Sequence, residues 1–209
     1  MSQSPQEAKP QPRGIGYSMV YPPGWREFRT STEHESVLTK LVTAEAKALG
    51  RADVVLMLRQ KTHEMFENLR RRGALGIALP VEKARGGAVP TSMIMTPLKS
   101  TDSGSLAGMV RKVAAGNAVD TQAVDGETWY LWNTNEPAEE APEYKNLSLN
   151  MVVPRPRPDG STDPEPKAGL WLRYSYASLE TGENNEEFTE ALQDLGYAIL
   201  GTFKWVPIQ

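Results

Sequence analysis

The chain has 209 residues, no cysteine, two histidines and a formal net charge of −3. The lack of cysteine excludes disulfides, thiolate metal sites, iron–sulfur clusters and a cysteine nucleophile, and two histidines are too few for a three-histidine metal site. A chain of this length buries enough apolar surface to fold without a metal or a disulfide. We therefore expect one globular domain over residues 14–209, with no metal and no cofactor.

Residues 1–13 are polar and contain three prolines, so we predict a disordered tail there. The segment lacks the apolar stretch of a signal peptide, and no window of the sequence approaches the ~20 apolar residues of a membrane helix. The expected location is the cytoplasm, without a membrane partner.

The charges are divided unevenly along the chain. Residues 1–115 contain 17 basic and 10 acidic side chains, whereas residues 116–209 contain 6 basic and 16 acidic ones. Either the two halves pack on one another within the chain, or they mediate self-association, head to tail or as a dimer. An association of the second kind is expected to weaken as salt screens the charges.

The first third of the chain is predicted to contain an alternating strand over residues 14–23 and a helical hairpin over residues 32–73. Thr32 and Glu35 have the spacing of a capping box at the start of the first helix, and Asp53 is placed to cap the second. The apolar stripe of the first helix consists of Val37, Leu38, Leu41, Val42 and Leu49.

The remainder is predicted to be mostly sheet. It includes a third helix, which Asp102 or Ser103 caps, and a final helix, which Asn184 or Asn185 caps. The Asp-Gly pair at residues 125–126 predicts a hairpin with a type I′ turn.

Five prolines in residues 154–167 predict a long mobile connection without regular structure. In the strand that follows, Leu170, Leu172 and Tyr174 are expected on one face of the sheet, with Trp171 on the other. Because most links between strands are short, the sheet should be mainly antiparallel. The predicted fold class is α+β, a mainly antiparallel sheet sandwiched by helices, with an N-terminal helical hairpin.

An aromatic turn follows the first strand (Val20-Tyr21-Pro22-Pro23-Gly24-Trp25), and the chain closes with a strand, a helix over residues 186–200 and the segment Gly201-Thr202-Phe203-Lys204-Trp205. This order of elements resembles the PsbP-like superfamily, which includes the photosystem extrinsic protein, bacterial lipoproteins and secretion-effector chaperones. The resemblance implies a sheet sandwiched by helices, and a binding or assembly module more often than an enzyme. The hairpin at residues 32–73 is longer than expected for that family. The Ala-, Arg- and Gly-rich composition resembles that of actinobacterial proteins.

The sequence lacks the residue patterns of common catalytic sites. His34 and His63 are interpreted as helix-surface residues, and no Gly-x-Ser-x-Gly elbow or phosphate-binding glycine loop is present. The acidic loop over residues 135–143 is interpreted as solvated rather than as a calcium site. We therefore expect a non-catalytic protein-interaction module, such as an adaptor, chaperone or scaffold. The alternative is a small-ligand-binding protein or an enzyme that uses carboxylate, arginine or tyrosine side chains.

Two groups of residues are candidates for contacts with a partner. Arg70, Arg71 and Arg72 end the second helix, but a sequence pI of about 5.6 and the absence of a nearby aromatic side chain argue against nucleic acid. Trp129 and Trp132 stand three apart in one strand and so face opposite sides of the sheet. In a sheet covered on both faces both tryptophans are buried, whereas an exposed one would anchor a partner.

Overall fold

The computed structural model describes residues 14–82, 89–100, 104–137, 144–179 and 185–208. Several predicted features lie outside these ranges: the tail at residues 1–13, the helix caps Asp102, Ser103 and Asn184, and residues 138–143 of the acidic loop.

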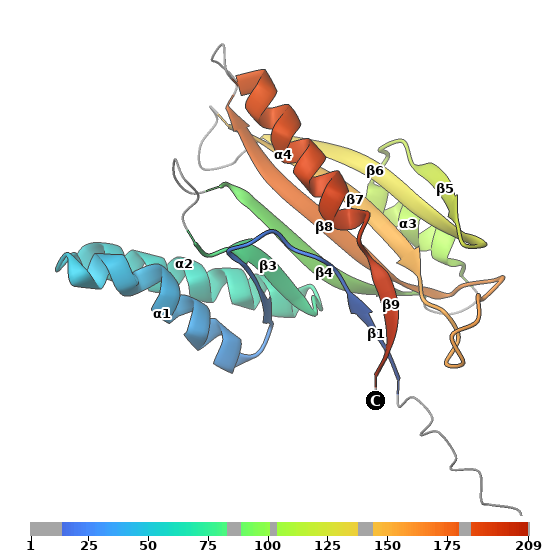
Figure 1. Cartoon of the computed structure of the whole chain (residues 1–209), viewed down its shortest axis with the longest axis horizontal. Helices are drawn as coiled ribbons and strands as arrows, with labels where there is room; N and C mark the ends of the chain where they lie inside the picture. Colours follow the sequence, from blue (N-terminus) through green and yellow to red (C-terminus); the bar gives the residue numbers. More distant parts are fainter. Residues whose placement is uncertain (1–13, 83–88, 101–103, 138–143, 180–184, 209) are drawn as a thin grey trace, which may run out of the picture.

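The described part of the chain contains four helices and nine strands (Figure 1). The helices are α1 (Thr32–Ala48), α2 (Ala52–Arg71), α3 (Leu106–Ala114) and α4 (Asn185–Leu200). The strands are β1 (Gly14–Ser18), β2 (Trp25–Arg29), β3 (Gly76–Pro80), β4 (Thr91–Lys99), β5 (Asp120–Val124), β6 (Glu127–Pro137), β7 (Tyr144–Pro154), β8 (Ala168–Leu179) and β9 (Lys204–Ile208). This arrangement confirms the predicted α+β fold, in which helices pack on a mainly antiparallel sheet.

Seven strands form one sheet in the order β2-β3-β4-β8-β7-β6-β5, and every neighbouring pair is antiparallel. The other two strands, β1 and β9, pair with each other and bring the two ends of the described chain together (Figure 1). β8 lies at the centre of the sheet, paired with β4 from Thr91↔Tyr176 to Lys99↔Ala168 and with β7 on its other side.

One face of the sheet carries the largest hydrophobic cluster. α4 lies across it, and the side chains beneath are almost without solvent exposure. They include Met93, Met95, Leu172 and Tyr174, each 0% exposed. The predicted alternation in β8 is therefore confirmed, because Leu170, Leu172 and Tyr174 enter this core while Trp171 packs with the cluster on the opposite face.

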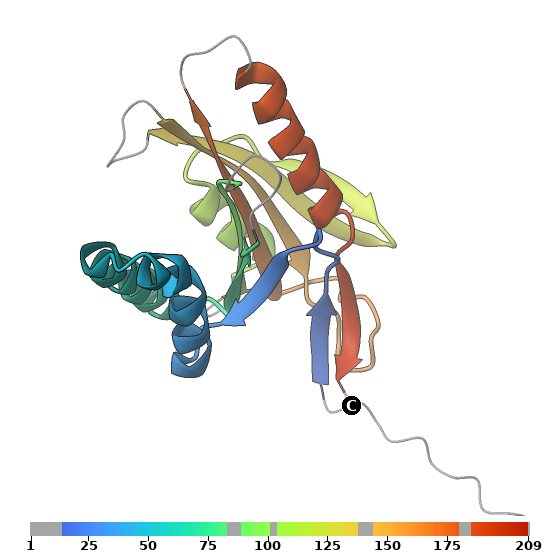
Figure 2. The same cartoon turned by 60° about the vertical axis from the view of Figure 1, so that its left-hand side comes forward.

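The opposite face carries helices at its two sides (Figure 2), and a groove lies between them. The α1–α2 hairpin packs over β2, β3 and β4 through a cluster that includes Phe28, Phe66 and Ile77. α3 packs over β4, β6, β7 and β8 through a second cluster that includes Leu98, Trp132 and Val152. The two helical units thus share β4, which contacts the arm through Ile94 and α3 through Leu98.

The helix starts differ from those predicted. Ser31, not Thr32, caps α1, and its side chain accepts a hydrogen bond from the backbone N–H of His34. α2 has Arg51 at its N-cap position, and Asp53 lies in the first turn, paired with Arg51. α3 is capped by Ser105, whose side chain accepts from the backbone N–H of Gly108.

The turn between β5 and β6 has the predicted conformation, whereas the first and last strands differ from the prediction. Asp125 and Gly126 both have positive φ, 49° and 81°, and join β5 to β6 as the type I′ prediction requires. The first strand ends at Ser18, earlier than predicted, and β9 is a strand that the sequence did not indicate. No helix or strand occupies the proline-rich residues 155–167. None of the helices in the described ranges has the length and apolarity to cross a membrane.

Candidate functional site

The α1–α2 hairpin is an arm that projects from one side of the sheet (Figures 1 and 2). Its base packs on the sheet through Leu38 of α1 and through Phe66 and Leu69 of α2. Beyond the base, none of the described residues 41–58 belongs to a hydrophobic cluster shared with the sheet. Gly50, at φ 67°, makes the turn between the helices in a conformation that disfavours other residues. The outer half of the arm is therefore held by contacts between its own two helices.

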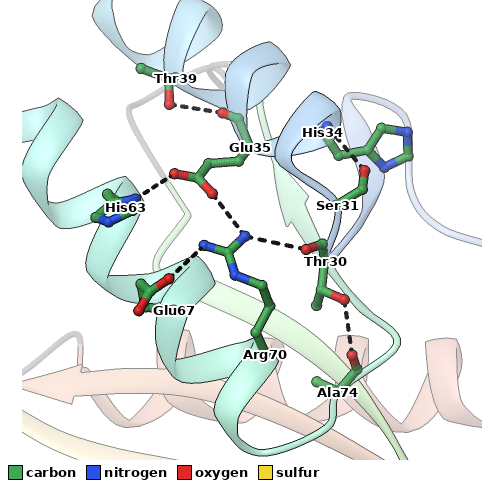
Figure 3. A network of polar contacts seen from close by, with 9 residues as sticks. All are labelled: Thr30, Ser31, His34, Glu35, Thr39, His63, Glu67, Arg70 and Ala74. Carbon is green, nitrogen blue, oxygen red and sulfur yellow. Dashed lines mark hydrogen bonds and ion pairs between the residues drawn. The ribbon is translucent and has the colours of Figure 1, made fainter.

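A polar network fastens the base of the arm (Figure 3). The Glu35 carboxylate on α1 accepts a hydrogen bond from Arg70 on α2 at 2.8 Å and lies 2.7 Å from Nδ1 of His63. Arg70 also donates to Glu67 at 3.2 Å and to the backbone oxygen of Thr30 at 3.3 Å. We call Glu35, His63, Glu67 and Arg70 the latch, because they join the start of α1 to the last turns of α2.

The charges of the latch are mutually stabilised. Burial alone would raise the pKa of Glu35, whose side chain is 16% exposed, but the hydrogen bonds from His63 and Arg70 outweigh burial and lower it. The hydrogen bond to Glu35 raises the pKa of Arg70 in turn. Glu35 therefore stays ionised at neutral pH and holds the two helices in a fixed relation.

The three arginines singled out from the sequence have different surroundings. Arg70 is committed to the latch, and its guanidinium also lies 5.9 Å from the ring centre of Phe66. Arg71 donates to the side chain of Asn68. Arg72 lines the groove between α2 and α3.

The two candidate tryptophans lie on opposite faces of the sheet, as their spacing predicts. Trp132 is 3% exposed and stacks at a tilt on Trp171, with ring centres 5.8 Å apart. Trp129 is half-buried and meets Phe203 edge to face at 6.0 Å. Both rings pack within the fold.

The surface of the arm carries several exposed apolar side chains. The described chain exposes ten large apolar side chains, and five of them lie on the arm. We call these five the arm patch: Leu41, Val42, Leu49, Leu56 and Met57. Leu49 and Leu56 are the most open of them, at 70% and 65%. Leu41, Val42 and Leu49 belong to the apolar stripe predicted from the sequence, and all three remain exposed. Leu41 and Val42 line a pocket with Leu79 and Thr91 of the sheet.

Within the described ranges, no group of three His, Asp or Glu side chains is placed to hold a metal ion. Each of the two histidines has a hydrogen-bonding partner near the base of the arm. Nδ1 of His34 accepts a hydrogen bond from the backbone N–H of Arg29 at 2.6 Å, and His63 belongs to the latch.

The chain matches no protein-family model and no curated protein. Among solved structures, it is similar to the cyanobacterial PsbP (CyanoP) of Synechocystis, with 9% identity and a TM-score of 0.43 over 97% of each chain. It is also similar to a protein of Bacteroides thetaiotaomicron, with 9% identity and a TM-score of 0.38; the alignment covers 91% of this chain but only 47% of the other, so this chain spans about half that protein's length. The first of these bears the name of the family that the sequence resembles. At such TM-scores neither similarity carries an argument about residues, activity or partners.

Proposed function

We propose that the chain is a non-catalytic protein-interaction module and that the α1–α2 arm is its binding element. The observation that supports this proposal is the arm patch, which holds half of the exposed large apolar side chains of the described chain. Exposed apolar side chains that gather on one element mark sites of association. The partner is another protein chain or a second copy of this one, as expected of an adaptor, chaperone or scaffold in the cytoplasm.

The construction of the arm suits this role. Burying apolar surface stabilises a complex by roughly 25 cal/mol per Å². The net affinity is higher when the binding element is already ordered, because less conformational entropy is lost on binding. The latch fixes the base of the arm through Glu35 and Arg70. Farther along α1, Thr43 and Ala46 are buried. Binding therefore requires little new ordering of the arm.

A photo-crosslinker at position 56 tests the proposal. Leu56 is replaced by p-benzoylphenylalanine, and the chain is irradiated in a cell that expresses it; the control carries the crosslinker at position 188 in place of Phe188, which is 48% exposed on α4. We expect a discrete protein adduct from position 56, which the additional substitutions Leu49→Gln and Met57→Gln remove. Mass spectrometry of the adduct distinguishes a second copy from a different protein.

Two results contradict the proposal. In the first, position 56 gives no protein adduct at all. In the second, positions 56 and 188 give the same adducts in equal yield, as random encounters would.

A further inference from the structure

A groove separates α2 from α3 on the open face of the sheet. Its volume is about 810 Å³, within the range typical of small-molecule sites. β4 and β8 form the floor with Ile94, Thr96, Trp171 and Arg173. α2 contributes one wall, and Val113 of α3 lies on the other.

The groove lies where the two helical units on this face pack on different parts of β4. The arm packs on β2, β3 and Ile94 of β4, whereas α3 packs on Leu98 of β4 and on β6, β7 and β8. Along β4, Met93 and Met95 on the α4 side are 0% exposed, while Ile94 and Thr96 between them are only half-buried. The same alternation occurs in β8, where Trp171 and Arg173 are the half-buried residues. The floor is thus open to a ligand.

Hydrogen bonds to buried polar residues hold two side chains of the floor in place, Trp171 and Arg173. The indole N–H of Trp171 donates to Oδ1 of Asn150 at 3.1 Å, so its hydrogen-bonding need is already met. Arg173 donates from Nε to the hydroxyl of Ser148 at 3.2 Å and pairs with Glu136 at 3.3 Å. Ser148 and Asn150 are 1% and 3% exposed. A ligand would therefore meet an aromatic ring and a guanidinium that are held in place before it arrives.

The lining combines an apolar surface with an excess of positive charge. Met65, Leu69, Ile94, Val113 and Trp171 supply the apolar part. Lys61, Arg72 and Arg173 are the basic residues of the lining and Glu64 is the acidic one. With Glu136, which pairs with Arg173, the site has three basic and two acidic side chains. An apolar cleft with a few fixed polar groups is the usual form of a small-molecule site, and the charge of those groups selects the ligand.

We propose that this groove binds a small organic anion. Its aromatic or aliphatic body lies on Ile94 and Trp171, and its carboxylate or sulfonate group faces the cationic side chains of Arg72 and Arg173. This site is separate from the arm patch, and neither proposal depends on the other.

The probe for this site is 8-anilino-1-naphthalenesulfonate, an aromatic anion, and its neutral counterpart is N-phenyl-1-naphthylamine. Arg72→Glu reverses a charge in the lining. The matched control is Arg59→Glu, the same change on the same helix, because Arg59 is not part of the lining. Reversing the charge of the exposed Arg72 is expected to weaken binding of the anion about five- to tenfold. The control should change it less than about twofold, and the neutral probe should respond to neither substitution.

A second variant tests the place of binding. Thr96→Trp fills the floor and should abolish binding of both probes, whereas Thr96→Val keeps the volume of the side chain and should retain it. Melting curves establish that each variant is folded. The chain with Leu49→Gln, Leu56→Gln and Met57→Gln should bind the anion as the unaltered chain does, since these residues lie on the arm.

Three results overturn the proposal. The anionic probe fails to bind in a saturable one-to-one manner, the Arg59 and Arg72 variants weaken it equally, or the arm variant removes its binding while Thr96→Trp does not. The last result assigns the probe to the arm patch and leaves the groove without a ligand.

Discussion

Glu35 is the residue on which the geometry of the arm depends most directly. It is the common partner of His63 and Arg70, and its side chain is only 16% exposed. The sequence assigned it to a capping box with Thr32, which is a local role. In the structure the carboxylate instead meets residues 28 and 35 positions away. Sequence spacing detects a helix start, but it contains no information about a charge that arrives from a second helix.

Replacing Glu35 by Gln should lower the free energy of unfolding by about 1–2 kcal/mol, because Arg70 loses its less exposed carboxylate partner. The control is Glu67→Gln, which touches the same arginine from a side chain that is 63% exposed and should cost less than about 0.5 kcal/mol. Urea titrations of the two variants measure the difference.

The same pair of variants predicts a pH dependence. The pKa of Glu35 is lower in the folded chain than its ordinary value of 4.5, so its contribution to stability is complete above that value and disappears as pH falls through the folded pKa. The difference between the unaltered chain and Glu35→Gln should therefore shrink as the pH falls below 4.5. A difference that stays unchanged in strongly acidic solution would contradict this account of the latch.

At the scale of elements, the sequence predicted what periodicity and turns control and missed what distant contacts control. The alternation of β8 and the Asp125-Gly126 turn are local patterns, and both are confirmed. The strand β9 depends on pairing with β1, and no local signal announces a partner at the other end of the chain. The groove was missed for a similar reason, since its floor and walls come from two strands and two helices that only the fold brings together.

Gly196 shows how closely α4 approaches the sheet. A methyl group at this position would lie 2.4 Å from Cδ1 of Tyr174 and 2.8 Å from Leu149. Gly196→Ala should therefore destabilise the chain by about 1–3 kcal/mol despite the better helix propensity of alanine. The matched control is Gly108→Ala in α3, where the nearest atom is the Ser105 hydroxyl at 3.5 Å; it should be neutral or stabilising by up to about 1 kcal/mol. Thermal melts compare the two, and equal effects would contradict the close packing of α4.

For the whole molecule, the division of charge along the chain leaves two kinds of association to be distinguished. An association of copies through their basic and acidic halves is electrostatic and weakens as salt screens the charges. Binding through the arm patch is apolar and should vary little with salt. The two surfaces proposed above also differ in kind, since the arm offers apolar side chains to a protein and the groove offers an open cleft of apolar and basic side chains to a small anion.

The affinity of the chain for the protein captured through position 56, measured by titration at low and high salt, tests the central claim most directly. The substitutions Leu49→Gln, Leu56→Gln and Met57→Gln are compared with Val20→Gln, Phe188→Gln and Ile208→Gln, three exposed apolar residues outside the arm. We predict that the arm variant weakens binding at least about tenfold, as three buried apolar contacts require, while the control and the change of salt alter it less than about twofold. Equal losses in the two variants, or binding that salt abolishes, would contradict the arm as the binding element.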